Sequence, residues 1–261
     1  MKNVTWNKLR FVLCLISIAV IVASVPTYRE VLRNVERIIS TDWIVIDAGH
    51  GGFDGGASSA EGVTEKDINL AIAKKIEKLA LADGWNVAMT RSEDVALNKS
   101  DKGAIRSKKT SDLLERKRII HEVAPLATVS IHLNSFTADR SVHGAQVFYP
   151  SGSEKEPVIS ESKRLAETIQ EQLINAIDDG TSRTALSKNG VLILKNPKTP
   201  IAIVECGFLS NYEEAKRLES SDYQEKLAKS IYNGIMIYAD KEGKSKLKLV
   251  DSKTGNTGLE E

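Results

Sequence analysis

Short runs of aliphatic and β-branched residues alternate along the chain with longer stretches in which apolar residues recur every three or four positions. The short runs predict strands at residues 43–47, 85–90, 127–132, 145–149, 190–194 and 201–205. The longer stretches predict amphipathic helices at residues 66–83, 113–123, 156–177 and 221–241. Strands that alternate with helices are typical of an α/β domain with a largely parallel sheet, and we expect one such domain over residues 42–242.

Polar residues at the ends of these segments indicate where helices begin and end. Thr64 is followed three residues later by Asp67, which resembles a capping box, and Gly84 is typical of a helix end. Ser210 and Glu213 have the same spacing and predict the start of another helix, with Ser210 as its cap.

Three further segments lack the pattern of a folded core. Residues 92–111 are rich in Lys and Ser without an apolar period, so we expect a surface loop that does not cover a neighbouring site. Residues 27–41 are predicted to be a short amphipathic connector. Residues 243–261 are rich in Lys, Ser, Gly and Glu and are expected to form a disordered polar tail.

The N-terminal segment has the order of charge and apolarity that is typical of export signals. Lys2, Lys8 and Arg10 precede an uncharged apolar run at residues 11–25. This length falls between a signal-peptide core and a full membrane span, so a cleaved signal peptide and an uncleaved signal-anchor both remain open for residues 1–26. In either case we expect the domain to act outside the cytoplasmic membrane, anchored or secreted.

The overall charge and the cysteines exclude some classes of protein. The formal net charge is +1 and no Lys/Arg stripe is interleaved with aromatic residues, so nucleic-acid binding is not expected. Cys14 and Cys206 do not provide a disulfide framework. Cys206 follows an apolar run and is expected to be a small core residue, with a nucleophilic cysteine as the alternative.

Polar side chains stand at the carboxyl ends of three predicted strands. His50 follows the first strand, and His132 and Glu205 each close a later one. These ends meet at one edge of an open α/β sheet, where ligands bind, and Glu65 adds a carboxylate at the start of a helix. Two imidazoles and one carboxylate suit a catalytic zinc ion, which leaves Glu205 to take a proton from water and pass it to a leaving amine. Each residue alone has a structural explanation, and their joint placement favours the site.

Other catalytic signatures are missing from the sequence. His121 and Glu122 are followed by Pro125 where a zinc peptidase helix of the H-E-x-x-H type has its second histidine. The chain also has no G-x-S-x-G elbow and no Walker A loop.

Four segments resemble, in order, the signature elements of the zinc-dependent N-acetylmuramoyl-L-alanine amidases of the amidase-3 family. They are DAGHGG at residues 47–52 together with Asp54 and the glycines at 55–56, EKD at 65–67, SIHLNS at 130–135 and VECGFLSN at 204–211. Weaker matches occur at residues 89–91 and 114–116, so the resemblance covers roughly residues 43–240.

The resemblance implies a fold, a cofactor and a reaction. The fold is a six-stranded sheet flanked by helices. One Zn²⁺ per chain would be held by His50, Glu65 and His132, with Glu205 as general base and acid. The substrate would be peptidoglycan, cut at the amide between the lactyl group of N-acetylmuramic acid and L-alanine.

The arrangement of the whole chain resembles a subgroup of this family. A single N-terminal anchor, one catalytic domain without wall-binding repeats and the insertion at residues 92–111 are similar to the sporulation amidases. Those enzymes help to form muramic-δ-lactam in the spore cortex, which germination needs. The resemblance therefore implies action between the forespore and mother-cell membranes, and an accessory activating protein is left open.

Further residues have candidate roles in which a structural function competes with substrate binding. Asn134 is a candidate for binding substrate or orienting a ligand, and a turn residue is the alternative. Arg91 and Arg116 are candidates for binding a stem-peptide carboxylate, with structural ion pairing as the alternative. His143 precedes a predicted strand and is a candidate for substrate binding, and Asp47 is a candidate support for the histidine loop.

Two other functions compete with the amidase. A zinc peptidase or carboxypeptidase acting on cell-wall peptides would need a basic pocket for a terminal carboxylate. A non-catalytic wall-binding module would keep the fold without turnover, but the complete set of His50, Glu65, His132 and Glu205 speaks against it.

Overall fold

The computed structural model describes residues 43–97 and 104–241, in which six strands form a single mixed sheet. The strands are β1 (Trp43–Ala48), β2 (Asn86–Met89), β3 (Ala127–Asn134), β4 (Gln146–Pro150), β5 (Leu186–Lys188) and β6 (Ile201–Phe208). They lie in the order β2-β1-β3-β6-β4-β5, and all neighbours are parallel except β4 and β6. The predicted largely parallel, six-stranded sheet is therefore confirmed.

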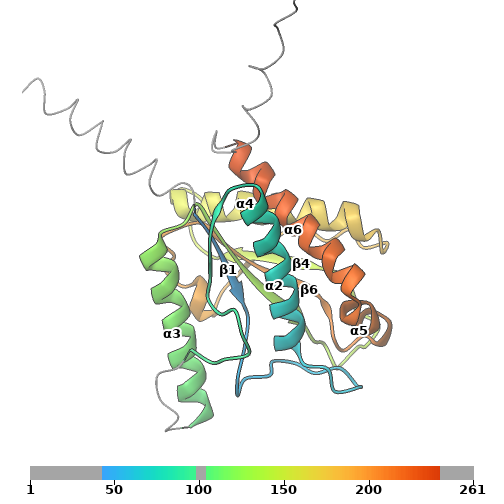
Figure 1. Cartoon of the computed structure of the whole chain (residues 1–261). Coiled ribbons are helices and arrows are strands. Elements are labelled where there is room, and N and C mark those ends of the chain that lie inside the picture. Colours follow the sequence, from blue (N-terminus) through green and yellow to red (C-terminus); the bar gives the residue numbers. More distant parts are fainter. Residues whose placement is uncertain (1–42, 98–103, 242–261) are drawn as a thin grey trace, which may run out of the picture. The chain divides into compact units, whose positions relative to one another are not determined.

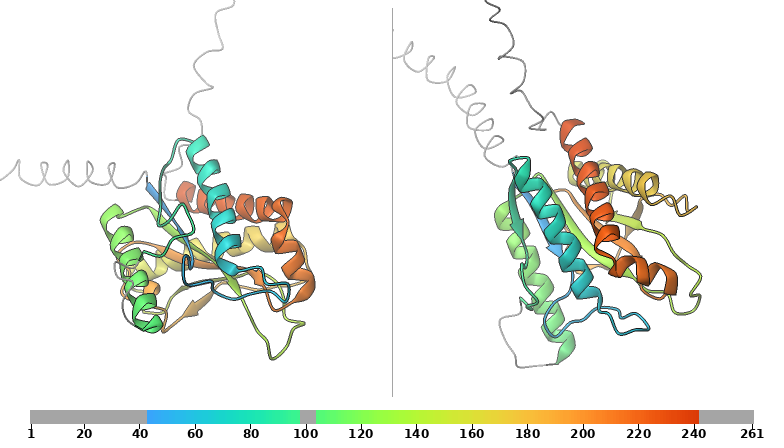
Figure 2. Two further views of the ribbon diagram at one scale, coloured as in Figure 1. Left: turned by 60° about the horizontal axis from the view of Figure 1, so that its bottom comes forward. Right: turned by 45° about the vertical axis from the view of Figure 1, so that its right-hand side comes forward.

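Helices cover both faces of this sheet (Figure 1). They are α2 (Glu65–Ala82), α3 (Ile105–Val123), α4 (Pro157–Ile177), α5 (Tyr212–Glu219) and α6 (Ser221–Lys241), with a short 3-10 turn, η1 (Leu192–Leu194). Helices α2, α4 and α6 pack on one face, whereas α3 and η1 lie on the other, as the turned views in Figure 2 also show.

The alternation of side chains along β6 assigns its residues to these two faces. Val204 and Cys206 belong to the larger core, under α2, α4 and α6, while Ile201 and Ile203 belong to the smaller core under α3 and η1. Successive side chains of a strand point to opposite faces, so Glu205 lies on the α3 face. Cys206 is completely buried, as expected, and burial raises the pKa of its thiol.

The prediction of a surface loop at residues 92–111 was wrong for residues 105–111, which form the first two turns of α3. The buried face of α3 carries Asp112, Arg116 and Ile120 at intervals of four residues. Two of these three are charged, so the helix lacks the apolar period by which a helix is recognised in a sequence.

The predicted strand at residues 190–194 was also wrong. The edge strand β5 lies before it, Gly190 has a φ of +77°, and the apolar run continues as η1. Ile193 and Leu194 are buried in the smaller core from this helical turn. Periodicity does not distinguish so short an apolar run as a strand or a helical turn.

Neither of the two predicted capping sites forms a regular capping box. Helix α5 is capped by Asn211, whose side chain accepts from the backbone of Glu214, while Ser210 accepts from the backbone of Phe136 instead. Helix α2 begins after Thr64, but the Thr64 hydroxyl contacts the Asp67 carboxylate and makes no side-chain bond to the helix backbone.

The predicted leader (1–26), connector (27–41) and tail (243–261) lie outside the described residues. Within the described residues, none of the helices combines the length and apolarity that a membrane span requires.

Candidate active site

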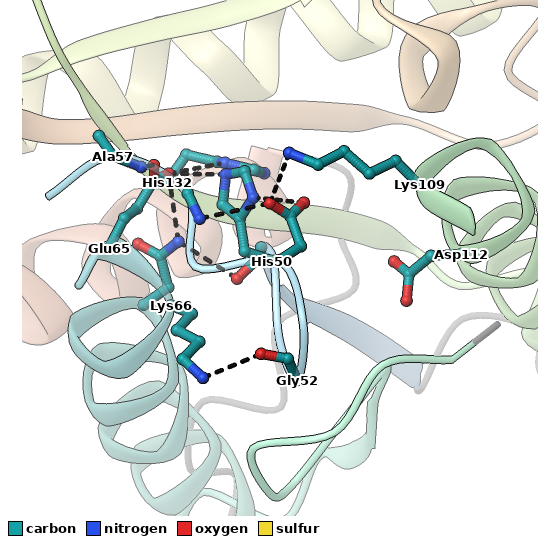
Figure 3. A network of polar contacts seen from close by, with 12 residues as sticks. His50, Gly52, Ala57, Glu65, Lys66, Lys109, Asp112 and His132 are labelled. Carbon is teal, nitrogen blue, oxygen red and sulfur yellow. Dashed lines mark hydrogen bonds and ion pairs between the residues drawn. The ribbon is translucent and has the colours of Figure 1, made fainter. Parts of the chain in front are cut away.

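Three potential metal ligands converge at the carboxyl end of the central strands. His50 lies in the loop after β1, Glu65 is the first residue of α2, and His132 lies near the end of β3. Glu65 Oε1 is 3.1 Å from both His50 Nε2 and His132 Nδ1, and the three donor atoms lie within 4.8 Å of one another (Figure 3). The imidazole rings meet edge to face, with their centroids 4.9 Å apart. The sequence prediction that these residues meet is therefore confirmed.

Two glycines allow this close approach. A Cβ at Gly49 would lie 2.3 Å from the His132 ring. A Cβ at Gly56, which has a φ of +71°, would lie 2.5 Å from the Glu65 carboxylate. His50 itself has a φ of +62°, a conformation that non-glycine residues adopt rarely and mostly at functional sites.

A buried ion pair lies beneath the histidine loop. Arg116 donates to Asp47 and Asp112 at 2.6 Å each, and both Arg116 and Asp47 are only 1% exposed. Burial alone would raise the pKa of Asp47, but the Arg116 guanidinium and hydrogen bonds from Ser130 and Thr90 lower it to about 2. Asp47 thus supports the loop through Arg116 rather than through direct contact with an imidazole.

Two guanidinium groups hold the backbone of the loop. Arg116 donates to the carbonyls of Ala48 and His50 at 2.7 and 2.6 Å. Arg91 donates to the carbonyls of Ala48 and Gly49 and to two further backbone carbonyls. Structural ion pairing describes Arg116, and backbone contacts account for Arg91, whose binding of substrate stays a prediction.

A carboxylate outside the cluster orients His50. Asp54 Oδ2 is 2.9 Å from His50 Nδ1, and Lys109 on α3 contacts the other Asp54 oxygen at 2.7 Å. Burial alone would lower the pKa of His50, but hydrogen bonds to Asp54 and Glu65 raise it to about 9. Carboxylates commonly fix metal-binding histidines in this way, which leaves Nε2 facing the cluster.

Two backbone amides fix the Glu65 carboxylate, and its Oε1 faces the two imidazoles. It is 3% exposed, and it accepts from the backbone of Ala57 and Leu133 at 2.8 and 3.0 Å. Burial would raise its pKa, but His132 and His50 hold it well below its usual range. A buried carboxylate that faces two imidazole nitrogens has the donor set of a three-ligand catalytic zinc site, so the residues present fit this ion.

Glu205 lies beside this cluster. In the parallel pairing of β3 and β6 it is the register partner of His132, and it is 9% exposed. Lys188 on β5 contacts its Oε1 at 3.3 Å. A cavity of about 250 Å³ lies over these groups. Its wall includes His50, Lys109, Leu113, His132, Ile193 and Glu205.

The remaining candidates lie apart from this cavity. The side chain of Asn134 accepts from the backbone of Ser135, as a turn residue does. The His143 imidazole contacts the carbonyl of Ser141. Neither Asn134 nor His143 is among the described residues that line the cavity, and their binding of substrate stays a prediction.

Sequence reasoning assigned no role to several residues around the site. Asn69 is buried, and its amide donates to the Gly49 carbonyl and to Glu65 Oε1 at 3.3 and 3.4 Å. Its spacing of four residues from Glu65 places it on the same helix face, which was a usable indication. Asp54 belongs to the first segment that resembles the family signature, which was its indication, whereas Lys188 lies on a strand that was not predicted and had none.

Known proteins are similar to this chain in sequence or in fold. The germination-specific N-acetylmuramoyl-L-alanine amidase of Bacillus subtilis is 34% identical over 77% of this chain and 81% of that protein. The CwlD amidase of Clostridioides difficile, solved with the GerS lipoprotein, is 39% identical with a TM-score of 0.71, covering 76% of this chain and 98% of that one. The amidase AmiC2 of Nostoc punctiforme is 28% identical with a TM-score of 0.61, covering 76% of this chain and 97% of that one.

The family model for N-acetylmuramoyl-L-alanine amidase matches residues 44–236, which include all three members of the histidine–glutamate cluster and Glu205. The resemblance of the sequence segments is thereby confirmed. The chain belongs to the amidase-3 family and is an N-acetylmuramoyl-L-alanine amidase that acts on peptidoglycan.

Proposed function

We propose that this amidase uses zinc to cut the bond between N-acetylmuramic acid and L-alanine in the spore cortex, as a step toward muramic-δ-lactam. The germination-specific relative of Bacillus subtilis and the CwlD amidase of Clostridioides difficile support the spore role. The observation that carries the chemistry is the placement of Glu205 beside His132, next to three converging ligands and facing one cavity.

His50, Glu65 and His132 would hold the zinc ion, because their donor atoms lie within 4.8 Å of one another and Asp54 fixes the orientation of His50. When bound there, zinc supplies a Lewis acid that polarises the scissile carbonyl and makes water a better nucleophile near neutral pH.

Glu205 performs the proton transfers. Its carboxylate takes a proton from the attacking water and returns one to the nitrogen of L-alanine, so the carbon–nitrogen bond breaks and a neutral amine leaves. The mostly buried side chain is directed by Lys188 at 3.3 Å, and Ile203 and Ile193 make the adjoining wall apolar.

The chemistry is tested with the protein and its Glu205→Gln variant, each supplied with zinc and incubated with peptidoglycan. Mass spectrometry is expected to find free stem peptides with an unblocked L-alanine for the unaltered protein only, and both proteins are expected to bind one equivalent of zinc. Undiminished cleavage by the variant would reject Glu205 as the base, and release of single amino acids would indicate a peptidase.

The spore role is tested in a Bacillus subtilis strain that lacks its germination-specific amidase. Expression of this chain during sporulation is expected to restore muramic-δ-lactam in the cortex and germination of the spores. The Glu205→Gln variant, expressed to the same level, is expected to restore neither. Amidase activity in vitro without restoration in spores would reject the cortex as the site of action.

Residues 1–26 direct the enzyme across the cytoplasmic membrane in this proposal, because cations precede an apolar run there. Fractionation of cells expressing the full chain is expected to place the amidase domain outside the membrane, either attached or released. A variant that begins at residue 27 is expected to stay in the cytoplasm, and its export would contradict the role of the leader.

An accessory protein that activates the enzyme is part of the proposal. The CwlD amidase of Clostridioides difficile is known in a complex with the GerS lipoprotein, which motivates the expectation for this chain. Extract of sporulating cells is expected to increase the activity of the purified protein. An unchanged rate with extract, at saturating zinc, would show that this chain works alone.

A further inference from the structure

The cleft does not end at Glu205 but continues into a second cavity over the segment between β5 and η1. This cavity has a volume of about 450 Å³. Lys188 and Val191 line both it and the cavity over the metal ligands, so the two spaces adjoin at these side chains. The rest of its wall is mixed: Leu192 and Leu194 lie beside the polar residues Ser151, Asn189, Lys195 and Asn196.

The charge of this second cavity is one-sided. Lys188 and Lys195 line it, and no Asp or Glu is among the described residues of its wall. The Lys188 side chain is 34% exposed, and its ammonium lies 3.3 Å from Glu205 Oε1 and 4.1 Å from the centroid of the Phe148 ring. Such a wall offers cations and amide groups to an anionic, hydrogen-bonding ligand.

The backbone of this segment is held in place at both lysines. The carbonyl of Lys188 accepts from the backbone of Ser151 at 3.3 Å, as β5 pairs with β4. The carbonyl of Lys195 accepts from the ammonium of Lys117 on α3. Both lysines therefore extend from backbone positions that are held by a hydrogen bond.

The position of Glu205 tells which half of the substrate reaches this cavity. If Glu205 returns a proton to the leaving nitrogen, that nitrogen lies next to its carboxylate. The peptide attached to the nitrogen then extends past Glu205 toward Lys188, and the muramoyl half lies on the side of the metal ligands.

We propose that the second cavity is the binding site for the carboxylate of the leaving peptide, held by Lys188 and Lys195. The residue after L-alanine is a D-glutamate linked through its side-chain carboxyl, so its α-carboxylate is free. Two residues of extended chain span roughly 7 Å, which suffices to pass from Glu205 over Lys188. This inference rests on the proposed function, because Glu205 as proton donor sets the direction of the peptide.

Two substrates that differ in one group test the site. They are N-acetylmuramoyl-L-alanyl-D-glutamate and the same compound with its α-carboxyl group amidated. The full chain with zinc is expected to cleave the free acid about fivefold better in kcat/KM, the upper end of what one partly exposed ion pair supplies. In Lys195→Gln this preference is expected to fall to within about twofold, through a lower kcat/KM on the free acid.

Two matched variants show whether the preference for the free acid depends on a cation at position 195 or only on the net charge of the protein. Lys195→Arg keeps the cation and is expected to keep the preference for the free acid. Lys198→Gln removes the same charge three residues further along, outside the residues that line this cavity, and is expected to behave like the unaltered protein. Equal loss of preference in the Lys198 and Lys195 variants would reduce the effect to net charge and overturn the site.

Direct binding separates this inference from the proposed reaction. The dipeptide L-alanyl-D-glutamate and its α-amide are titrated into the same proteins and followed by calorimetry. Cleavage of both substrates at equal rates would overturn the subsite and leave the amidase standing. Binding of the free acid that depends on Lys195, without cleavage of either substrate, would support the subsite and contradict the proposed reaction.

Discussion

Asp47 and Glu65 are two buried carboxylates at the same end of the sheet, and the fold compensates their negative charges in different ways. Asp47 is paired with the guanidinium of Arg116 and accepts from Thr90 and Ser130, so its charge is compensated within the fold. Glu65 is as deeply buried, but it faces two imidazoles, and no Lys or Arg is among its contacts in the described part of the chain.

This difference separates a carboxylate with a structural role from one that is suited to bind a metal ion. Burying a carboxylate is costly unless a cation or hydrogen bonds compensate it. The compensation of Asp47 is permanent, because an arginine does not lose its proton in proteins. The compensation of Glu65 is conditional, because an imidazole carries a charge only when it is protonated, and in the proposed function a zinc ion would take its place. Asp47 therefore anchors the histidine loop, whereas the groups that compensate the charge of Glu65 can be exchanged for a metal ion.

The largest effect is expected from breaking the permanent pair. Arg116→Met should lower the free energy of unfolding by about 3–5 kcal/mol, because it leaves Asp47 charged and buried without its partner. Urea unfolding measures this. Arg118→Met, on the same helix, removes an exposed arginine that pairs with Glu115 and Glu122, and its midpoint should stay close to that of the unaltered protein. Equal stability of the two variants would mean that Asp47 does not depend on Arg116.

The conditional carboxylate should control stabilisation by metal. At a zinc concentration of about one hundred times the Kd, the unaltered protein should gain about 2.7 kcal/mol of unfolding free energy. Glu65→Gln should gain almost nothing at the same concentration, because one ligand is lost. Glu61→Gln, an exposed change in the loop that precedes α2, is the control and should respond normally. Thermal unfolding with and without zinc gives the answer, and equal gains in all three proteins would exclude Glu65 as a ligand.

The contrast also explains what the sequence could and could not predict. His50, His132 and Glu205 were identifiable because each stands where an apolar strand ends, and parallel strands bring these ends together. The partner of Asp47 was not identifiable, because Arg116 lies on a helix whose buried face carries charged residues, and no sequence pattern indicates which carboxylate that face contacts. The anchoring pair depends on tertiary structure, and no local pattern encodes it.

The contribution of the Asp47 pair to the free energy of unfolding should depend on pH in the acid range. The pKa of Asp47 is lowered from 3.8 to about 2, so its contribution is present above pH 4 and is lost as the pH falls through about 2. The shift corresponds to about 2 kcal/mol. The difference in unfolding free energy between the unaltered protein and Asp47→Asn should therefore shrink between about pH 4 and pH 2. A difference that is constant over this range would contradict the lowered pKa.

The smallest effect is expected at Asp54, which connects the cluster of metal ligands to helix α3. Asp54 links the two systems, since one oxygen orients His50 and the other contacts Lys109 on α3. Asp54→Asn keeps the shape but removes the charge, and zinc affinity should fall about tenfold, which is about 1.4 kcal/mol. Asp139→Asn, in an exposed loop, should leave zinc affinity unchanged. Calorimetric titration with zinc decides, and unaltered affinity in Asp54→Asn would mean that the loop backbone, held by Arg91 and Arg116, orients His50 without a carboxylate.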